Sequence, residues 1–139
     1  MIIADTNVVS EFMKDAPDPA VLEWAQGVDS TDLTICVVTV EEIERGLGRL
    51  PEGRRRRDLQ QRWSGMVDSV ADTVAVYDLP ASRHTARILV AAEASGRPMS
   101  LAGAQIAGIC LAGGYQLATR NVGDFSTTAG LTILNPFDR

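Results

Sequence analysis

Three acidic residues of this chain each follow an apolar run, and folding could bring the three side chains into one site. Asp5 follows a short run at the N-terminus, Glu42 follows a second run, and Asp124 lies shortly after a third. Oxygen donors without histidine or cysteine suit a hard divalent cation such as Mg²⁺ or Mn²⁺. Such a cation relieves repulsion between carboxylates, activates water and stabilises charge on a phosphodiester during in-line attack. These residues therefore predict a metal centre for phosphodiester hydrolysis.

Polar residues next to these acids have the chemistry needed to orient them. Thr6, Asn7 and Thr119 carry hydroxyl or amide groups that can hold carboxylates and bound water in place. Asn121 can act in the same way. We expect these side chains to surround the metal centre.

Each acid also has a purely structural interpretation. Asp5 or Thr6 can cap the helix that follows. Thr39 and Glu42 have the spacing of a capping box, in which the glutamate serves the helix N-terminus. Asp124 can be an exposed loop acid. The residue pattern leaves both interpretations open, so the answer depends on whether the three positions converge.

A parallel sheet would bring the acids together. Short apolar runs predict strands at 2–4, 33–38, 74–77, 116–119 and 131–134. Apolar residues at helical spacing predict intervening helices that begin near residues 8, 18, 39, 54, 80 and 100. This alternation indicates a single α/β domain over residues 1–139 with a mainly parallel sheet of about five strands. The carboxyl ends of such strands share one edge, which is where ligands bind.

The charge distribution limits the kind of partner. A net charge of −5 argues against a protein that coats nucleic acid non-specifically. The basic residues are nevertheless clustered, and a local basic rim can grip a phosphate backbone or a protein partner. The candidate RNA or partner contacts are Arg54, Arg55, Arg83 and Arg87. A solvated helix face is the plainer interpretation of the same arginines.

The chain has no sequence feature of a membrane or secreted protein. Its longest apolar run is too short to span a bilayer, and its N-terminus lacks the pattern of a secretory signal. Cys36 and Cys110 lie in apolar surroundings without metal-binding spacing. We expect a cytoplasmic protein with two buried, reduced thiols.

Several longer motifs resemble those of the PIN-domain family, specifically VapC-type ribonuclease toxins of bacterial type II toxin–antitoxin pairs. The matching segments cover nearly the whole chain: Ile2–Glu11, Thr39–Ile43 with Gly46, Leu50–Arg55, Gly96–Ser100, Ala104–Ala107, Leu117–Phe125 and Leu134–Pro136. The resemblance implies a three-layer α/β/α fold and a Mg²⁺- or Mn²⁺-dependent endoribonuclease that cuts structured RNA such as tRNA or rRNA. It also implies a homodimer inhibited by a cognate VapB-like antitoxin.

The resemblance also assigns roles within the site. Asp5 and Glu42 match two acidic metal-site residues, and a further position falls within 121–124, at Asn121 or Asp124. One acid is missing, because Gly103 stands where the family has an aspartate that would be a principal metal ligand. We expect this chain to bind metal weakly and to cleave RNA poorly or not at all. The replacement is compatible with either an engineered silencing or a natural variant.

Two other functions deserve comparison with the nuclease hypothesis. A non-catalytic PIN-like module that binds antitoxin or RNA would explain Gly103, and recovery of activity by Gly103→Asp would argue against it. A phosphoryl-transfer domain with Asp5 as nucleophile is less consistent with the sequence, because no second acid follows closely and no lysine lies late in the chain.

Overall fold

Four short strands, built mainly from apolar residues, form the centre of the structure. The computed structural model describes residues 1–138. All strand pairs are parallel, in the order β2-β1-β3-β4. The strands are β1 (Ile2–Ala4), β2 (Leu33–Thr34), β3 (Gln116–Ala118) and β4 (Ile133–Leu134).

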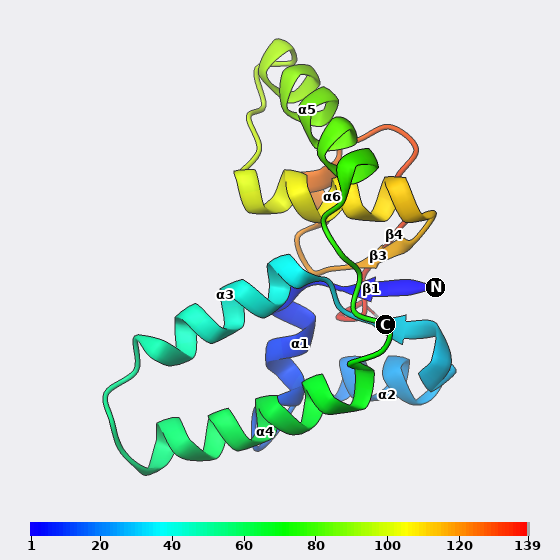
Figure 1. Ribbon diagram of the computed structural model, residues 1–139. Coiled ribbons are helices and arrows are strands. Elements are labelled where there is room, and N and C mark those ends of the chain that lie inside the picture. The colour runs from blue at the N-terminus through cyan, green and yellow to red at the C-terminus, as the bar shows by residue number, and fades with distance from the viewer. Residues whose placement is uncertain (139) are drawn as a thin grey trace.

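Helices cover both faces of this sheet, as Figure 1 shows. Ile3 and Leu117 join one hydrophobic core, whereas Ala4 and Ala118 join the other. This division follows from the alternation of side chains along a strand. The first core contains α5 (Leu79–Ala94) and α6 (Leu101–Gly113); the helices of the second are α1 (Thr6–Phe12), α2 (Pro19–Gln26), α3 (Val37–Gly48) and α4 (Arg54–Val70). The predicted three-layer α/β/α fold is confirmed.

Local sequence signals account for most helix ends. Asp18 caps α2 by accepting a hydrogen bond from Ala20 N at 2.8 Å, with Pro19 at the first helical position. Ser100 caps α6, and Gly114, with φ of 70°, ends it. The chain also forms two 3₁₀ turns, η1 (Ser30–Asp32) and η2 (Val122–Phe125). Within residues 1–138 no helix has the length and apolar character needed to cross a bilayer.

The strand predictions were partly wrong. The run at 74–77 forms only an isolated bridge between Ala75 and Cys36 rather than a fifth strand. Ala75 is buried, but Val76 is 62% exposed, so this run lacks the two covered faces of a central strand. The predicted strand at 33–38 ends at Thr34, because packing turns the chain into α3 from Val37 despite the β-branched residues.

Two helix starts also differ from prediction. The first helix begins at Thr6 rather than Val8, because Asp5 caps it from the end of β1. The capping-box interpretation of Thr39 and Glu42 was wrong, since α3 begins two residues before Thr39. Cys36 occupies the cap position without a side-chain hydrogen bond. Glu42 therefore has no capping task and is available for another role.

Candidate functional site

The site residues predicted from the sequence converge on one cavity at the carboxyl ends of the strands. This cavity, called the sheet-edge cavity below, has a volume of about 460 Å³. Its walls include Asp5, Thr6, Asn7, Glu42, Gly103, Asn121 and Asp124, together with Pro98, Met99 and Phe125. The parallel sheet thus collects acids that lie far apart in the sequence.

Asp5 is held in place through both carboxylate oxygens. The residue is 6% exposed, and its backbone N–H donates to Ala118 O at 2.9 Å, which extends the pairing of β1 with β3. Oδ1 accepts a hydrogen bond from Thr6 N at 2.8 Å, while Oδ2 accepts one from Thr119 Oγ1 at 2.8 Å. Asn7 Nδ2 also donates to Oδ2 at 3.3 Å. Asp5 therefore combines the capping role with a fixed place in the cavity.

Asn7 and Thr119 join the loops that follow β1 and β3. The Thr119 hydroxyl is fully buried and accepts a hydrogen bond from Asn121 N at 3.1 Å. Asn7 Nδ2 lies 3.3 Å from Thr119 Oγ1, and Asn7 Oδ1 accepts a hydrogen bond from Arg120 N at 3.0 Å. These contacts support the expected orienting roles of Asn7 and Thr119, since they fix the surroundings of Asp5.

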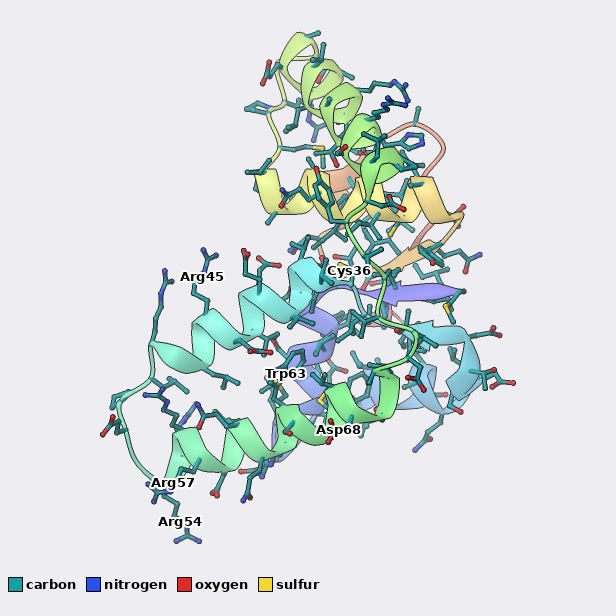
Figure 2. The ribbon with its side chains drawn as sticks, viewed as in Figure 1. Cys36, Arg45, Arg54, Arg57, Trp63 and Asp68 are labelled. Carbon is teal, nitrogen blue, oxygen red and sulfur yellow. The ribbon has the colours of Figure 1, made fainter. Side chains whose placement is uncertain are left out.

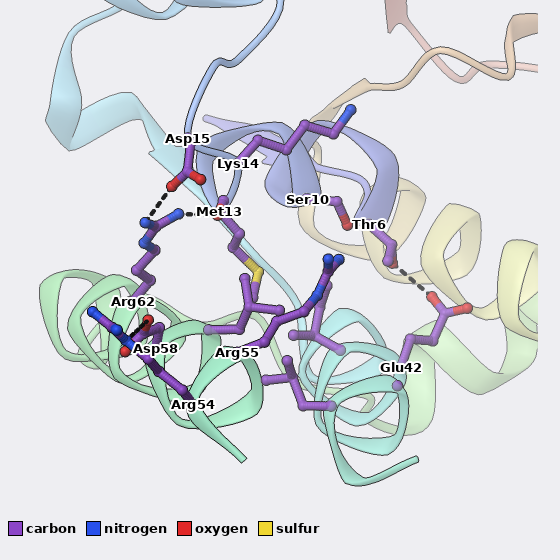
Figure 3. Close-up of a pocket in the computed structure, with 14 residues that line it drawn as sticks. Thr6, Ser10, Met13, Lys14, Asp15, Glu42, Arg54, Arg55, Asp58 and Arg62 are labelled. Atoms are coloured by element: carbon purple, nitrogen blue, oxygen red, sulfur yellow. Dashed lines mark hydrogen bonds and ion pairs between the residues drawn. The ribbon is translucent and has the colours of Figure 1, made fainter. Parts of the chain in front are cut away.

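Glu42 is connected to the sheet edge through Thr6. The Thr6 hydroxyl donates to Glu42 Oε1 at 2.7 Å, which joins the start of α1 to the middle of α3 (Figure 3). Thr39 was missed as a site neighbour; it is fully buried, and its Oγ1 lies 3.5 Å from Thr6 Oγ1. Thr39 lies four and eight residues before Ile43 and Leu47, which places it on the buried stripe of α3. This spacing could have identified Thr39 from the sequence, but we interpreted the residue as a helix cap.

Asn121 and Asp124, which follow β3 in the sequence, both line the sheet-edge cavity. Asn121 precedes η2 and Asp124 lies within it, with Asp124 N donating to Asn121 O at 3.0 Å. Both side chains are exposed, and either can supply an oxygen to the cavity. The turn η2 thus presents two oxygen donors from one short segment.

Gly103 lines the same cavity near the start of α6. Ser100 Oγ accepts a hydrogen bond from Gly103 N at 3.1 Å, so Gly103 is the third residue of the helix. A Cβ built at Gly103 would lie 2.9 Å from Ser100 Oγ and 4.0 Å from the Phe125 ring. A side chain here therefore requires a small adjustment of the Ser100 hydroxyl.

The donor set suits a hard cation in type, but its acids are not grouped closely. Carboxylate and amide oxygens are the ligands that Mg²⁺ and Mn²⁺ prefer. Within residues 1–138, however, no three carboxylate, histidine or cysteine side chains come together closely enough to hold a metal ion. Asp5, Glu42 and Asp124 line the cavity without forming such a cluster, and Gly103 contributes no side-chain donor to its wall.

Of the four predicted arginine contacts, two lie beside the site and two do not. Arg54 and Arg55 line a second, larger groove, which shares Thr6 and Glu42 with the sheet-edge cavity. Arg83 and Arg87 are exposed on α5 and line neither hollow. Sequence clustering alone did not distinguish these two groups.

The two cysteines have no nucleophilic role in this arrangement. Cys36 and Cys110 are free and buried, as expected from the sequence. Burial raises the pKa of both thiols, because an apolar environment disfavours the thiolate. Both side chains instead fill the core that α5 and α6 cover.

Comparison with known proteins identifies the family. No family model matches the chain. It is 40% identical over 139 residues to the VapC ribonuclease Y4jK of Sinorhizobium fredii, and 33% identical to the plasmid stability protein StbB of Pseudomonas syringae pv. tomato, with 99% of each chain covered. The structure of FitAcB from Neisseria gonorrhoeae superposes with a TM-score of 0.92 at 27% identity over the full length of both chains. This chain belongs to the VapC-type PIN-domain family of ribonuclease toxins.

Proposed function

We propose that this chain is a toxin-class endoribonuclease whose Mg²⁺ or Mn²⁺ centre lacks one ligand at Gly103. Its substrate class is structured RNA such as tRNA or rRNA, in which it would hydrolyse phosphodiester bonds. In its present form it binds metal weakly and cleaves RNA poorly or not at all. The observation that carries the proposal is the placement of Gly103 on the wall of the cavity that Asp5 and Glu42 also line.

The residues of the chain divide this work between holding and orienting. Asp5 and Glu42, with Asn121 or Asp124, would hold a cation. Thr6, Asn7 and Thr119 fix the side chain of Asp5, and Thr6 also fixes that of Glu42, through the hydrogen bonds described above. A bound cation would supply charge stabilisation to the phosphodiester and activation of water. An aspartate at position 103 would add a fourth carboxylate to the cavity wall, beside Asp5, Glu42 and Asp124.

The position also suits an acid on structural grounds. Residue 103 lies in the first turn of α6, where a negative charge interacts favourably with the helix dipole. Glycine in a helix instead costs up to about 1 kcal/mol relative to alanine. Local helix energetics therefore do not explain why glycine stands here.

We also propose a VapB-like antitoxin as partner, with a homodimer of this chain in the complex. The matching structures include FitAcB from Neisseria gonorrhoeae and FitAB bound to a DNA fragment. Structural neighbours of this kind are toxin–antitoxin complexes, and we extend the antitoxin partner to this chain because the match spans its full length. Co-purification with the antitoxin, followed by mass measurement of the complex in solution, tests this part.

The decisive experiment compares cleavage of bulk tRNA and rRNA by this chain and its Gly103→Asp variant. Gly103→Asn serves as the matched control, since it has nearly the same shape without the charge. Each protein is assayed in Mg²⁺, in Mn²⁺ and with chelator. We expect cleavage only by the aspartate variant and only with metal, and equal metal-dependent cleavage by the starting chain would overturn the proposal.

Metal binding can be measured without RNA. A cation that binds only the folded Gly103→Asp protein should stabilise it by about 2.7 kcal/mol at one hundred times its dissociation constant. Denaturant unfolding with and without Mn²⁺ reports this effect. The starting chain and Gly103→Asn should show a much smaller response at the same metal concentration.

A non-catalytic binding module is the second candidate function. It is favoured by the lack of a three-ligand metal cluster among residues 1–138. If neither chain cleaves RNA while the antitoxin binds both, this function replaces the first. Recovery of cleavage by Gly103→Asp would instead exclude a site that has decayed at several positions.

A further inference from the structure

Arg120 lies at the rim of the sheet-edge cavity, between two residues of the candidate site. It follows Thr119, whose hydroxyl donates to Asp5, and precedes Asn121, which lines the cavity. Its backbone N–H donates to Asn7 Oδ1 at 3.0 Å, and Asn7 is also a wall residue. Because adjacent Cα atoms are about 3.8 Å apart, the backbone of Arg120 lies within one residue of the cavity wall.

The Arg120 side chain is held over an aromatic ring. Its guanidinium carbon lies 4.5 Å from the centroid of the Phe137 ring. The negative face of an aromatic ring attracts a guanidinium in this position. Phe137 is itself fixed, because it packs against the second core and its backbone N–H donates to Asn135 Oδ1 at 3.0 Å. The segment after β4 thus restricts the direction in which the arginine after β3 points.

The guanidinium of Arg120 has no other partner among residues 1–138. In this part of the chain it forms neither an ion pair nor a side-chain hydrogen bond. Arg62, in contrast, donates to Met13 O at 2.7 Å and pairs with Asp15. Arg120 is exposed, so its N–H donors face solvent. A guanidinium that is held in place in this way suits an anion from outside the chain.

The charge of the cavity gives this cation a use. Asp5, Glu42 and Asp124 line the cavity, and none of its wall residues within 1–138 is basic. A bound metal would offset part of this negative charge at the phosphate that is cut, but a nucleic acid strand brings further phosphates next to it. Those phosphates need a cation outside the metal centre. Arg120 supplies one at the rim.

We propose that Arg120 binds an RNA backbone phosphate next to the scissile one, and that Phe137 positions its guanidinium for this contact. The inference rests on the proposed ribonuclease function and adds a substrate-binding residue outside the metal site. Arginine binds phosphate through charge-assisted hydrogen bonds in a planar fork. A ring beneath the guanidinium reduces the rotamer entropy that such a contact otherwise loses. RNA fits this place better than an acidic peptide, because the adjoining cavity is itself proposed to receive a phosphodiester.

The first test removes the charge at position 120. Arg120→Gln is compared with Arg57→Gln, whose exposed arginine extends from the outer end of α4 and lines neither the cavity nor the larger groove (Figure 2). Fluorescence anisotropy measures binding of labelled bulk tRNA and labelled rRNA fragments at several salt concentrations. We expect Arg120→Gln to weaken binding about tenfold and to reduce the salt slope by about one, with little change for Arg57→Gln. Equal effects of the two variants, or no measurable binding by the parent chain, would overturn the proposal.

The second test removes the ring and keeps the charge. In Phe137→Leu the side chain stays apolar, but the attraction between ring and guanidinium is lost. We expect RNA affinity to fall about two- to fivefold, the usual strength of an exposed cation–π contact, while the salt slope stays unchanged. Phe12→Leu is the matched control, because Phe12 packs against the same core, and its RNA affinity should stay close to that of the parent. Full affinity in Phe137→Leu would contradict the positioning role of the ring.

Metal affinity and kinetics separate substrate binding from a structural role. If Arg120 only supported the loop after β3, Arg120→Gln would loosen the surroundings of Asp5 and lower Mn²⁺ affinity in the Gly103→Asp background. The proposal predicts instead that Mn²⁺ affinity does not fall, and that KM for RNA cleavage rises while kcat changes little. If Gly103→Asp fails to cleave RNA, the proposed function fails, while anisotropy still decides the role of Arg120. If Arg120→Gln weakens antitoxin binding and leaves RNA affinity unchanged, Arg120 is a protein contact and the inference is wrong.

Discussion

The hydroxyl of Thr119 donates a hydrogen bond of 2.8 Å to Asp5 Oδ2 across 114 positions of sequence. The contact is a consequence of sheet register. Ala4 pairs with Ala118 in the parallel ladder, so the residues that follow them, Asp5 and Thr119, lie side by side at the carboxyl ends of the two strands. The register of β1 and β3 thereby supplies a buried donor to the carboxylate that the proposed chemistry needs most.

Replacement of Thr119 by valine should therefore destabilise the protein. Valine keeps the shape of threonine but leaves a buried carboxylate oxygen without its closest side-chain donor, which typically costs about 1–3 kcal/mol. Urea unfolding measures the change in the free energy of unfolding. Thr31→Val is the matched control, because Thr31 donates to Asp29 in an exposed setting, and we expect a change within about 0.5 kcal/mol. Equal losses in both variants would contradict this account of Thr119.

Removal of the Thr6 hydroxyl should impair metal binding more than folding. Thr6 donates to Glu42 Oε1 at 2.7 Å and so fixes the position of this carboxylate. Loss of such a supporting hydrogen bond typically lowers metal affinity about 10- to 100-fold. In the Gly103→Asp background, Mn²⁺ titration calorimetry should show this loss for Thr6→Val and recovery for Thr6→Ser. Unchanged affinity in the valine variant would show that Glu42 does not depend on Thr6.

The stability of the fold should depend on pH through Glu11. This side chain is 6% exposed, accepts a hydrogen bond from Lys14, and accepts another from Asp18 N at 3.0 Å. The Lys14 hydrogen bond is the main reason that the pKa of Glu11 is lowered from its ordinary value of 4.5 in the folded protein. A lowered folded-state pKa gives stability that is present above the unfolded-state pKa and lost as pH falls through the folded-state value.

Glu11→Gln tests this dependence directly. The variant should be less stable than the parent at about pH 7, and the difference should shrink as the pH falls below about 4.5. Urea unfolding across this range gives the free energy of unfolding of both proteins. A difference that stays constant down to about pH 3 would mean that burial of Glu11, rather than its charge, carries the effect.

The packing of α5 against α6 depends on the small size of Gly108. A Cβ at Gly108 would clash with Thr85 Oγ1 and would lie 2.7 Å from Ala81 O, which belongs to the backbone. Gly108→Ala should therefore destabilise the protein by about 1–3 kcal/mol in thermal or urea unfolding. Gly48→Ala, where a Cβ meets open space, should be neutral or stabilising by up to about 1 kcal/mol. A neutral Gly108→Ala would mean that the two helices can separate without cost.

The sequence by itself determined the elements that local chemistry specifies. Asp18 with Pro19 and Ser100 with Gly114 mark the ends of two helices, because side-chain caps and left-handed glycine act within a few residues. The apolar runs at 2–4 and 116–119 indicated buried strands, and the parallel arrangement followed from their alternation with helices. The sequence consequently predicts that Asp5, Glu42 and the 121–124 segment share one site.

Only the tertiary structure decided what packing controls. Val37 and Val38 have strand propensity, yet they lie in α3 because the sheet ends at Thr34 on that strand and the helix covers the core. The start of α3 in turn released Glu42 from the capping role and brought it within 2.7 Å of Thr6. Likewise, Arg54 to Arg57 are equivalent in sequence, but the direction in which each side chain leaves α4 places only Arg54 and Arg55 of these four along the groove beside the sheet-edge cavity. Such distinctions depend on contacts between distant segments, which no local pattern encodes.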